Sequence, residues 1–262
     1  MARLAISAAL ALTFDNLGEA SSLARGETVP SVGEHPSVTE ALPRLLDELD
    51  ACGLRATFFV EGINCELYPD AVREIAARGH ELGMHGWLHE RWVALSDVVE
   101  REVIDRAMAA FASLDLAPRG FRPPGGMLNQ GSSALLRAAG IEWCSPEGDE
   151  FGVRDGLAYV PFDWELVDAY HLMGAFSQLR ASRGDGAAPL DAGAALSRLR
   201  AGVEAAARDA RPTTVIMHPF LMLDPAWWGG VRSLLARIAR LARDGGLSVG
   251  PGGALARESR AL

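Results

Sequence analysis

The pair His85 and His89 carries the clearest chemical signal in the sequence. In a helical turn, two histidines at this spacing project to the same side and can bind one metal ion. Such a pair is weak evidence by itself, because it also arises by chance on helix faces. The apolar run before His85 strengthens the metal-binding interpretation, since polar residues after a buried strand face the functional end of a parallel sheet.

Asp15 and Asn16 also directly follow an apolar run. The carboxylate could serve as a general base, and the amide oxygen could be a metal ligand. The alternative is that Asp-Asn simply begins a turn, which both residue types favour. The two residues alone do not separate these interpretations.

Arg122 precedes two prolines and two glycines at 123–126, which impose an unusual backbone path. A guanidinium held there could pair with Asp15 and keep it ionised and oriented. The alternative is a surface arginine before a proline-rich turn.

His218 follows the apolar, β-branched run 213–217. An imidazole at the end of a buried strand could protonate a leaving amine, although a core histidine with satisfied hydrogen bonds is the ordinary alternative. Either Asp163 or Asp168 could hold this imidazole and raise its pKa, and the sequence leaves that choice open.

Short apolar runs that alternate with helical patterns must position these side chains. This alternation predicts an α/β fold with a parallel sheet or barrel, and about seven strands favour a barrel that need not be complete. We expect one domain over residues 1–262, because nothing resembles a hinge between two cores. The expected strands are 4–14, 56–61, 81–85, 120–122, 141–144, 158–162 and 213–217. Five helices are expected. The first ends at Gly53, the second covers 69–78, the third starts near Ser96, and the last two cover 192–208 and 226–243.

Two long connections, 17–35 and 182–193, interrupt this rhythm. Long loops in compact domains are often lids or binding loops, so both could cover a barrel mouth. A mobile surface insertion is the alternative, and it applies more to the second loop.

Composition excludes several classes of protein. The net charge of −9 argues against binding to nucleic acids or to anionic membranes. Cys52, Cys65 and Cys144 lack CxxC spacing, which argues against a disulfide framework and a thiolate zinc site. The apolar start 4–12 is too short for a convincing signal peptide, and no other stretch is long enough to cross a membrane, so we expect a cytoplasmic protein.

Five short motifs, in order along nearly the whole chain, resemble those of the polysaccharide deacetylase superfamily, also called the NodB-homology or carbohydrate esterase family 4 fold. Each motif is modest, but five at matching spacing form a strong pattern. TFDN at 13–16 is similar to the family's TFDD, HGWLH at 85–89 to H-S/T-x-x-H, RPPG at 122–125 to R-x-P-x-G, DW at 163–164 to the end of D-x-x-D-W, and IMH at 216–218 to L-x-H.

This resemblance implies a distorted (β/α)7 barrel and a metal-assisted hydrolase that removes an N-acyl group, acetyl or formyl, by direct attack of water. It implies Asp15 as general base, His218 as general acid and Arg122 as the residue that orients Asp15. It also implies a divalent metal ion, which we expect to be zinc. The implied metal ligands are Asn16, His85 and His89.

Three departures from the family pattern matter. Asn16 replaces a metal-binding aspartate, which predicts weaker metal binding and even a purified protein without metal. Gly86 replaces a Ser or Thr whose hydroxyl usually props the loop. Trp164, Asp168 and His218 with its following Pro-Phe resemble a cytoplasmic branch that includes allantoinase-like ring-opening amidohydrolases, and the sequence around the two histidines also resembles the sugar-lipid formamide deformylases.

We therefore expect an amino-sugar-containing substrate, free or attached to a nucleotide, a lipid or a small natural product. The alternatives are ring opening of a cyclic amide or imide, and a non-catalytic carbohydrate-binding relative, which only Asn16 favours. A homo-oligomer is compatible with the resemblance. Tryptophans at 87, 92, 164, 227 and 228 could stack on a sugar, although the alternative is that at least half of them are core residues. The candidate substrate contacts are Trp87, Pro124, Gly125, Asp163, Trp164 and Asp168.

Overall fold

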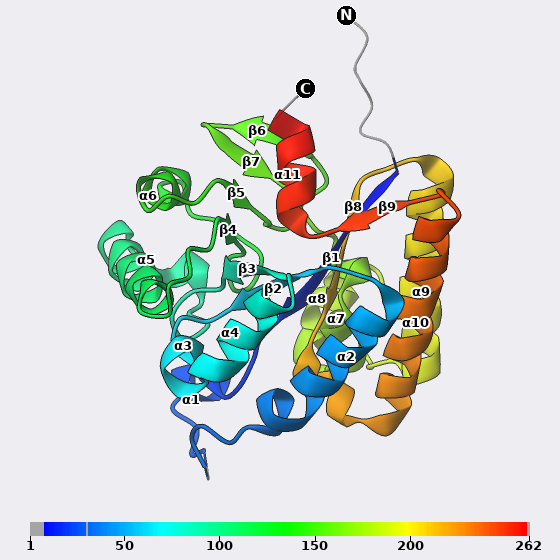
Figure 1. Cartoon of the computed structure of the whole chain (residues 1–262), viewed down its shortest axis with the longest axis horizontal. Coiled ribbons are helices and arrows are strands. Elements are labelled where there is room, and N and C mark those ends of the chain that lie inside the picture. Colours follow the sequence, from blue (N-terminus) through cyan, green and yellow to red (C-terminus); the bar gives the residue numbers. More distant parts are fainter. Residues whose placement is uncertain (1–7, 30, 261–262) are drawn as a thin grey trace, which may run out of the picture.

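The computed structural model describes residues 8–29 and 31–260, and its centre is a curled, mostly parallel sheet (Figure 1). The strand order β6-β7-β5-β4-β3-β2-β1-β8 has β6 and β8 at its ends, so the sheet forms a half-barrel, and only β6 and β7 pair in antiparallel fashion. The barrel-like α/β fold expected from the sequence is confirmed. The strands are β1 (Ala9–Asp15), β2 (Thr57–Val60), β3 (Glu81–Met84), β4 (Gly120–Phe121), β5 (Trp143–Cys144), β6 (Gly152–Arg154), β7 (Leu157–Tyr159), β8 (Thr213–Met217) and β9 (Ser248–Gly250).

Strand β1 is the centre of this sheet. All seven of its residues are buried, as expected for a parallel strand that is covered on both faces. It pairs in parallel with β8 on one side and with β2 and β9 on the other. The predicted strand 4–14 is confirmed from Ala9 onward, and its first residues, 4–7, lie outside the described residues.

The helices begin and end largely where the sequence predicts. Gly53, at φ 66°, ends α2 in the left-handed conformation that glycine adopts most easily. The Ser96 side chain accepts a hydrogen bond from the backbone N–H of Val99 and caps α5. The helices are α1 (Ala20–Ala24), α2 (Leu42–Cys52), α3 (Asn64–Leu67), α4 (Pro69–Ala77), α5 (Asp97–Ala112), α6 (Ser132–Ala138), α7 (Asp168–Leu172), α8 (Ser177–Ser182), α9 (Ala192–Asp209), α10 (Pro225–Arg243) and α11 (Gly252–Arg260).

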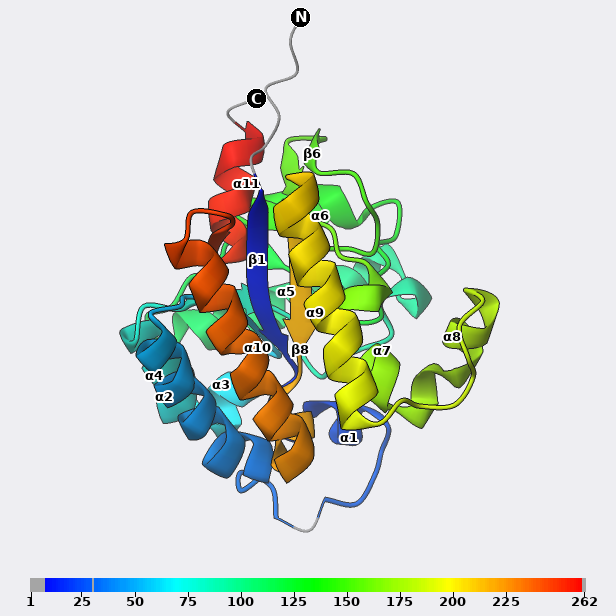
Figure 2. The same cartoon turned by 90° about the vertical axis from the view of Figure 1, so that its right-hand side faces the viewer.

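Figure 2 shows α9 and α10 side by side against β1 and β8, whose arrowheads point toward α1 and the 17–35 connection. The expected strand 158–162 is shorter than predicted, because the chain leaves β7 after Tyr159. Its continuation reaches the edge of β8 instead, where Val167 forms a parallel bridge with Ile216 and Thr214 Oγ1 donates to the Pro161 carbonyl at 2.7 Å. No helix within the described ranges is long and apolar enough to span a membrane.

Candidate active site

A cavity of about 390 Å³ opens at the carboxyl ends of the strands. It is lined by residues at the carboxyl ends of β1, β3, β4 and β8 or in the loops that follow them, so the strand ends bring together side chains that are far apart in the sequence. These six residues, here called the polar face, are Asp15, Asn16, His85, His89, Arg122 and His218.

Arg122 and Asp15 form a buried ion pair, as the sequence predicts. The guanidinium Nη1 donates to Asp15 Oδ1 at 2.6 Å, and both side chains are at most 5% exposed. Arg122 is held in turn by Thr13 Oγ1 at 2.9 Å and by Ser145 Oγ at 2.8 Å. This network fixes one carboxylate oxygen and leaves Oδ2, which lies 4.0 Å from His85 Nε2, for other contacts.

The two histidines lie together, but the predicted helical turn between them is wrong. Residues 85–91 form no helix, and His89 has a φ of 63°, which is uncommon for a non-glycine residue. The rings nevertheless meet with centroids 4.9 Å apart. A sharp non-helical loop therefore replaces the helix as the element that pairs them.

Glu90 supports this loop in place of the missing Ser/Thr hydroxyl. Its carboxylate accepts hydrogen bonds from the backbone N–H groups of Trp87 at 2.9 Å and Leu88 at 2.8 Å. Gly86 has a φ of 77°, and a Cβ there would lie 2.6 Å from Glu90 Oε2. Glycine at this position thus allows the carboxylate to approach the backbone.

Burial keeps both imidazoles neutral, because it lowers the pKa of His85 and of His89 to about 3. His85 Nδ1 donates to the Arg122 carbonyl at 2.7 Å, so the proton stays on Nδ1 and the Nε2 lone pair is free. A neutral imidazole with one nitrogen held by a carbonyl is the form that binds metal ions.

Asn16 completes a donor set that suits a divalent metal ion. Its φ of 60° places it in the left-handed region, and its Oδ1 is buried without a hydrogen-bond partner in residues 8–29 and 31–260. Such an orphaned oxygen is costly unless a ligand satisfies it. The described part of the chain has no group of three or more His, Cys, Asp or Glu side chains arranged as a metal site. The neutral Asn16 amide lines the same cavity as the two histidines and could serve as a third donor beside them.

His218 is held by Asp168, which decides between the two candidate aspartates. The imidazole Nδ1 donates to Asp168 Oδ1 at 2.5 Å, and the His218 backbone N–H donates to Oδ2 at 2.9 Å. Burial acts to lower the pKa of His218, but the charge of Asp168 and its hydrogen bond outweigh burial and raise that pKa above its ordinary value. Asp163 lies elsewhere, where it is exposed, pairs with Arg183 at 2.6 Å and accepts from the Glu165 N–H.

The candidate substrate contacts separate into two groups. Trp164 and Gly125 line the cavity. Trp87 is buried with Arg106 stacked 3.8 Å from its ring, and Pro124 is buried, but neither is among the residues that line the cavity. Trp87, Trp92 and Trp227 belong to the main hydrophobic core, which agrees with the expectation that at least half of the five tryptophans are core residues.

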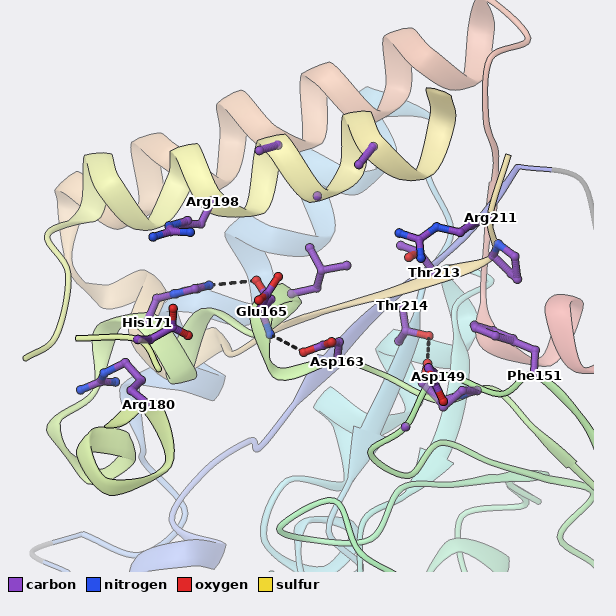
Figure 3. Close-up of a pocket in the computed structure, with 18 of the residues that line it drawn as sticks. Asp149, Phe151, Asp163, Glu165, His171, Arg180, Arg198, Arg211, Thr213 and Thr214 are labelled. Atoms are coloured by element: carbon purple, nitrogen blue, oxygen red, sulfur yellow. Dashed lines mark hydrogen bonds between the residues drawn. The ribbon is translucent and has the colours of Figure 1, made fainter. Parts of the chain in front are cut away.

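The two long connections also differ. Gly18, Ser21, Ser22, Arg25 and His35 from 17–35 line the cavity, and buried Glu19 pins this connection by accepting from Tyr68 Oη at 2.5 Å and from the Gly33 N–H at 2.6 Å. Residues from 182–193 instead line a second cavity of about 410 Å³, beside α9 (Figure 3). The expectation that both connections cover the same mouth is therefore wrong for the second one.

Sequence reasoning missed the residues that support the polar face. Thr13 and Ser145 are small polar residues at strand ends, a position that could have marked them. Met173 and Phe176, which also line the cavity, come from a segment with no motif, and the sequence holds no sign of where that segment folds.

A family model and a curated relative both match this chain. The model of the family described as polysaccharide deacetylase matches residues 7–144, more than half of the chain. Chitin deacetylase 1 of Saccharomyces cerevisiae is 32% identical over 130 residues, which are 49% of this chain and 38% of that protein, so the match spans about two fifths of its length.

Two solved structures extend the similarity to the whole chain. One described as a putative polysaccharide deacetylase from Mycobacterium smegmatis is 26% identical, with a TM-score of 0.81 over 100% of this chain and 93% of that chain. The Puue allantoinase has a TM-score of 0.75 over 98% of this chain and 91% of that chain, but at 16% identity this likeness shows the fold alone. From the family match, the chain belongs to the polysaccharide deacetylase family.

Proposed function

We propose that this protein is a metal-assisted hydrolase that removes an N-acyl group, acetyl or formyl, from an amino-sugar-containing substrate. The observation that carries the proposal is one cavity in which an arginine-paired Asp15 and an aspartate-backed His218 lie beside two neutral histidines. A base and an acid that line the same cavity suit the hydrolysis of an amide.

In this proposal Asn16, His85 and His89 hold the metal ion, and zinc is the metal we propose. When bound, such an ion polarises the acyl carbonyl as a Lewis acid. The unpartnered Asn16 oxygen and the free Nε2 of His85 support this assignment. Because the amide brings no negative charge, we propose that the ion binds more weakly than at a site with a second aspartate.

Asp15 accepts the proton of the attacking water. Arg122 holds Oδ1, so Oδ2 is the oxygen that can take the proton. Arg122 does not touch the substrate in this role and is a positioning residue.

His218 gives a proton to the departing amine. Asp168 fixes the proton on Nδ1, stabilises the imidazolium and leaves Nε2 as the donor toward the cavity. The raised pKa keeps a larger share of His218 protonated near neutral pH than an ordinary histidine would have. Water attack with this base and acid needs no covalent enzyme intermediate.

Metal analysis combined with an amine-release assay tests the proposal. We expect zinc-loaded protein to release free amine from N-acetyl or N-formyl amino sugars and to lose this activity with a chelator. Metal-loaded protein that binds a sugar but releases no amine would support a non-catalytic carbohydrate-binding relative instead. Chelator-insensitive opening of a cyclic amide or imide would support a ring-opening amidohydrolase.

A further inference from the structure

The cavity that holds the polar face has a second, apolar part. Six of its lining residues, here called the apolar wall, are Trp164, Val167, Met173, Phe176, Ile216 and Phe220. Five of them, all but Phe220, belong to or pack against a hydrophobic cluster that is separate from the main core. The wall is therefore a distinct apolar surface, and it faces the cavity.

Met173, Phe176 and Phe220 are the partly exposed members of this wall. Phe176 packs on Trp164 with ring centroids 5.3 Å apart. Apolar side chains left open to a cavity gain free energy when a ligand covers them. The wall reaches the reacting groups, because the Phe220 ring lies 5.4 Å from the His218 ring.

The segment that carries the wall is firmly anchored. Arg180 is 2% exposed and donates to the carbonyls of Tyr170, Met173 and Ala187. Tyr170 Oη donates to Asp185 at 2.5 Å, which ties the segment to the 182–193 connection. Arg180 also lines the second cavity, on the outer side of the segment (Figure 3). These hydrogen bonds hold the segment, and with it most of the wall, in a fixed position.

The chemistry of the wall is poorly suited to a bare sugar chain. Valine, isoleucine, methionine and phenylalanine side chains offer sugar hydroxyls no strong hydrogen-bond partner. Aromatic faces can stack on a sugar ring, but Val167, Met173 and Ile216 cannot. Sugar hydroxyls pressed against these residues would lose their bonds to water without replacement.

We infer that the substrate amide carries an apolar group, an aryl ring or an alkyl chain of several carbons, that lies against the apolar wall. This inference rests on the proposed function, because it places the reacting amide at the polar face. A cavity of about 390 Å³ lies in the size range of pockets that enclose whole small ligands. An acetyl group has only three heavy atoms and fills a small part of it.

Two substrate series test the inference on the zinc-loaded protein. The first varies the acyl group on glucosamine from acetyl to hexanoyl, and the second keeps N-acetylglucosamine and varies a 1-O-alkyl or 1-O-phenyl group. We expect kcat/KM to rise about fourfold per added methylene in one series, which corresponds to about 0.8 kcal/mol per buried methylene. The series that rises shows on which side of the amide the apolar group is attached.

Variants connect this rise to the wall. Phe176→Ala should lower the ratio of kcat/KM between the longest and the shortest substrate by about tenfold, and Phe176→Leu should restore most of it. Val153→Ala, at a residue that is 46% exposed on β6, is the matched control and should leave the ratio unchanged.

The outcomes separate the two proposals. Turnover of N-acetylglucosamine with flat kcat/KM in both series would overturn the apolar substrate group and leave the proposed function standing. A rise that survives Phe176→Ala unchanged would show that the wall is not the binding surface. Amine release from no member of either series would overturn the proposed function and this inference together.

Discussion

The polar face and the apolar wall share one cavity but come from different parts of the fold. The polar face is built from residues at the carboxyl ends of β1, β3, β4 and β8 or in the loops that follow them. Ion pairs and hydrogen bonds hold Asp15, Arg122 and His218 in place. Most of the wall comes from the irregular segment between β7 and α8, which is anchored through Arg180. The difference suggests that the strand ends carry the chemistry, whereas the irregular segment selects the substrate.

A variant of Asp15 tests most directly whether the polar face carries the chemistry. Asp15→Asn keeps the shape of the side chain but removes the base, so turnover of every substrate should fall by about 10²–10⁴-fold. Leaving Arg122 buried without its counter-charge should also lower the free energy of unfolding by about 3–5 kcal/mol, which a urea titration would detect. Asp163→Asn, at an exposed carboxylate outside the cavity, is the control. Wild-type turnover in Asp15→Asn would remove this residue as the base.

Asp168→Asn should have the next largest effect, on the order of 10²-fold in kcat/KM. The charge of Asp168 raises the pKa of His218, so its loss should lower that pKa. A general acid works in its protonated form, and the alkaline limb of the pH–rate profile should therefore move to lower pH. An unshifted limb in Asp168→Asn, or an equal shift in Asp163→Asn, would contradict the pairing.

Asn16→Asp tests whether residue 16 is a ligand of the metal ion. The added charge beside two neutral histidines should tighten zinc binding by at least about tenfold. Competition with a chromophoric chelator measures this without any turnover, and His85→Ala should abolish the binding. Equal affinities in the wild type and Asn16→Asp would exclude residue 16 as a ligand.

Glu61 tests how the polar face is supported, and its effect should be the smallest. Its Oε2 accepts hydrogen bonds from the backbone N–H of Leu17, the residue after Asn16, and from the Asn64 side chain. Burial raises the pKa of this carboxyl to about 8. The folded state then holds a proton that the unfolded chain releases above its ordinary pKa, so stability falls as pH rises from about 4.5 to about 8.

Glu61→Gln removes that titration. Relative to wild type it should gain on the order of 4 kcal/mol of unfolding free energy at pH 8 and little at pH 4.5. Urea unfolding at the two pH values gives the comparison. A gain of the same size at both would show that the carboxyl does not titrate in this window.

The sequence predicts the polar face better than the wall for a physical reason. Asp15, Arg122 and His218 each follow a buried strand, and parallel strands bring their carboxyl ends to one edge, so patterning alone places them together. The Asp168 pairing depends on how residues 160–168 cross to the edge of β8, and no local pattern encodes that path.

Local geometry explains where the structure departs from the elements predicted from the sequence. The spacing of the two histidines fits a helix, but Gly86 and His89, both at positive φ, form a loop that also brings the two rings together. Met173 and Phe176 have no sequence signal, because partly buried apolar residues outside a periodic element look like any others. Long-range packing, rather than periodicity, decides where they lie.

The most direct test of the central claim is the stoichiometry of one reaction. Zinc-loaded wild-type protein should convert an N-acyl amino sugar, with or without an attached alkyl group, into free amine and carboxylic acid in equal amounts. Full zinc occupancy without amine or acid release from any of these substrates would contradict the account.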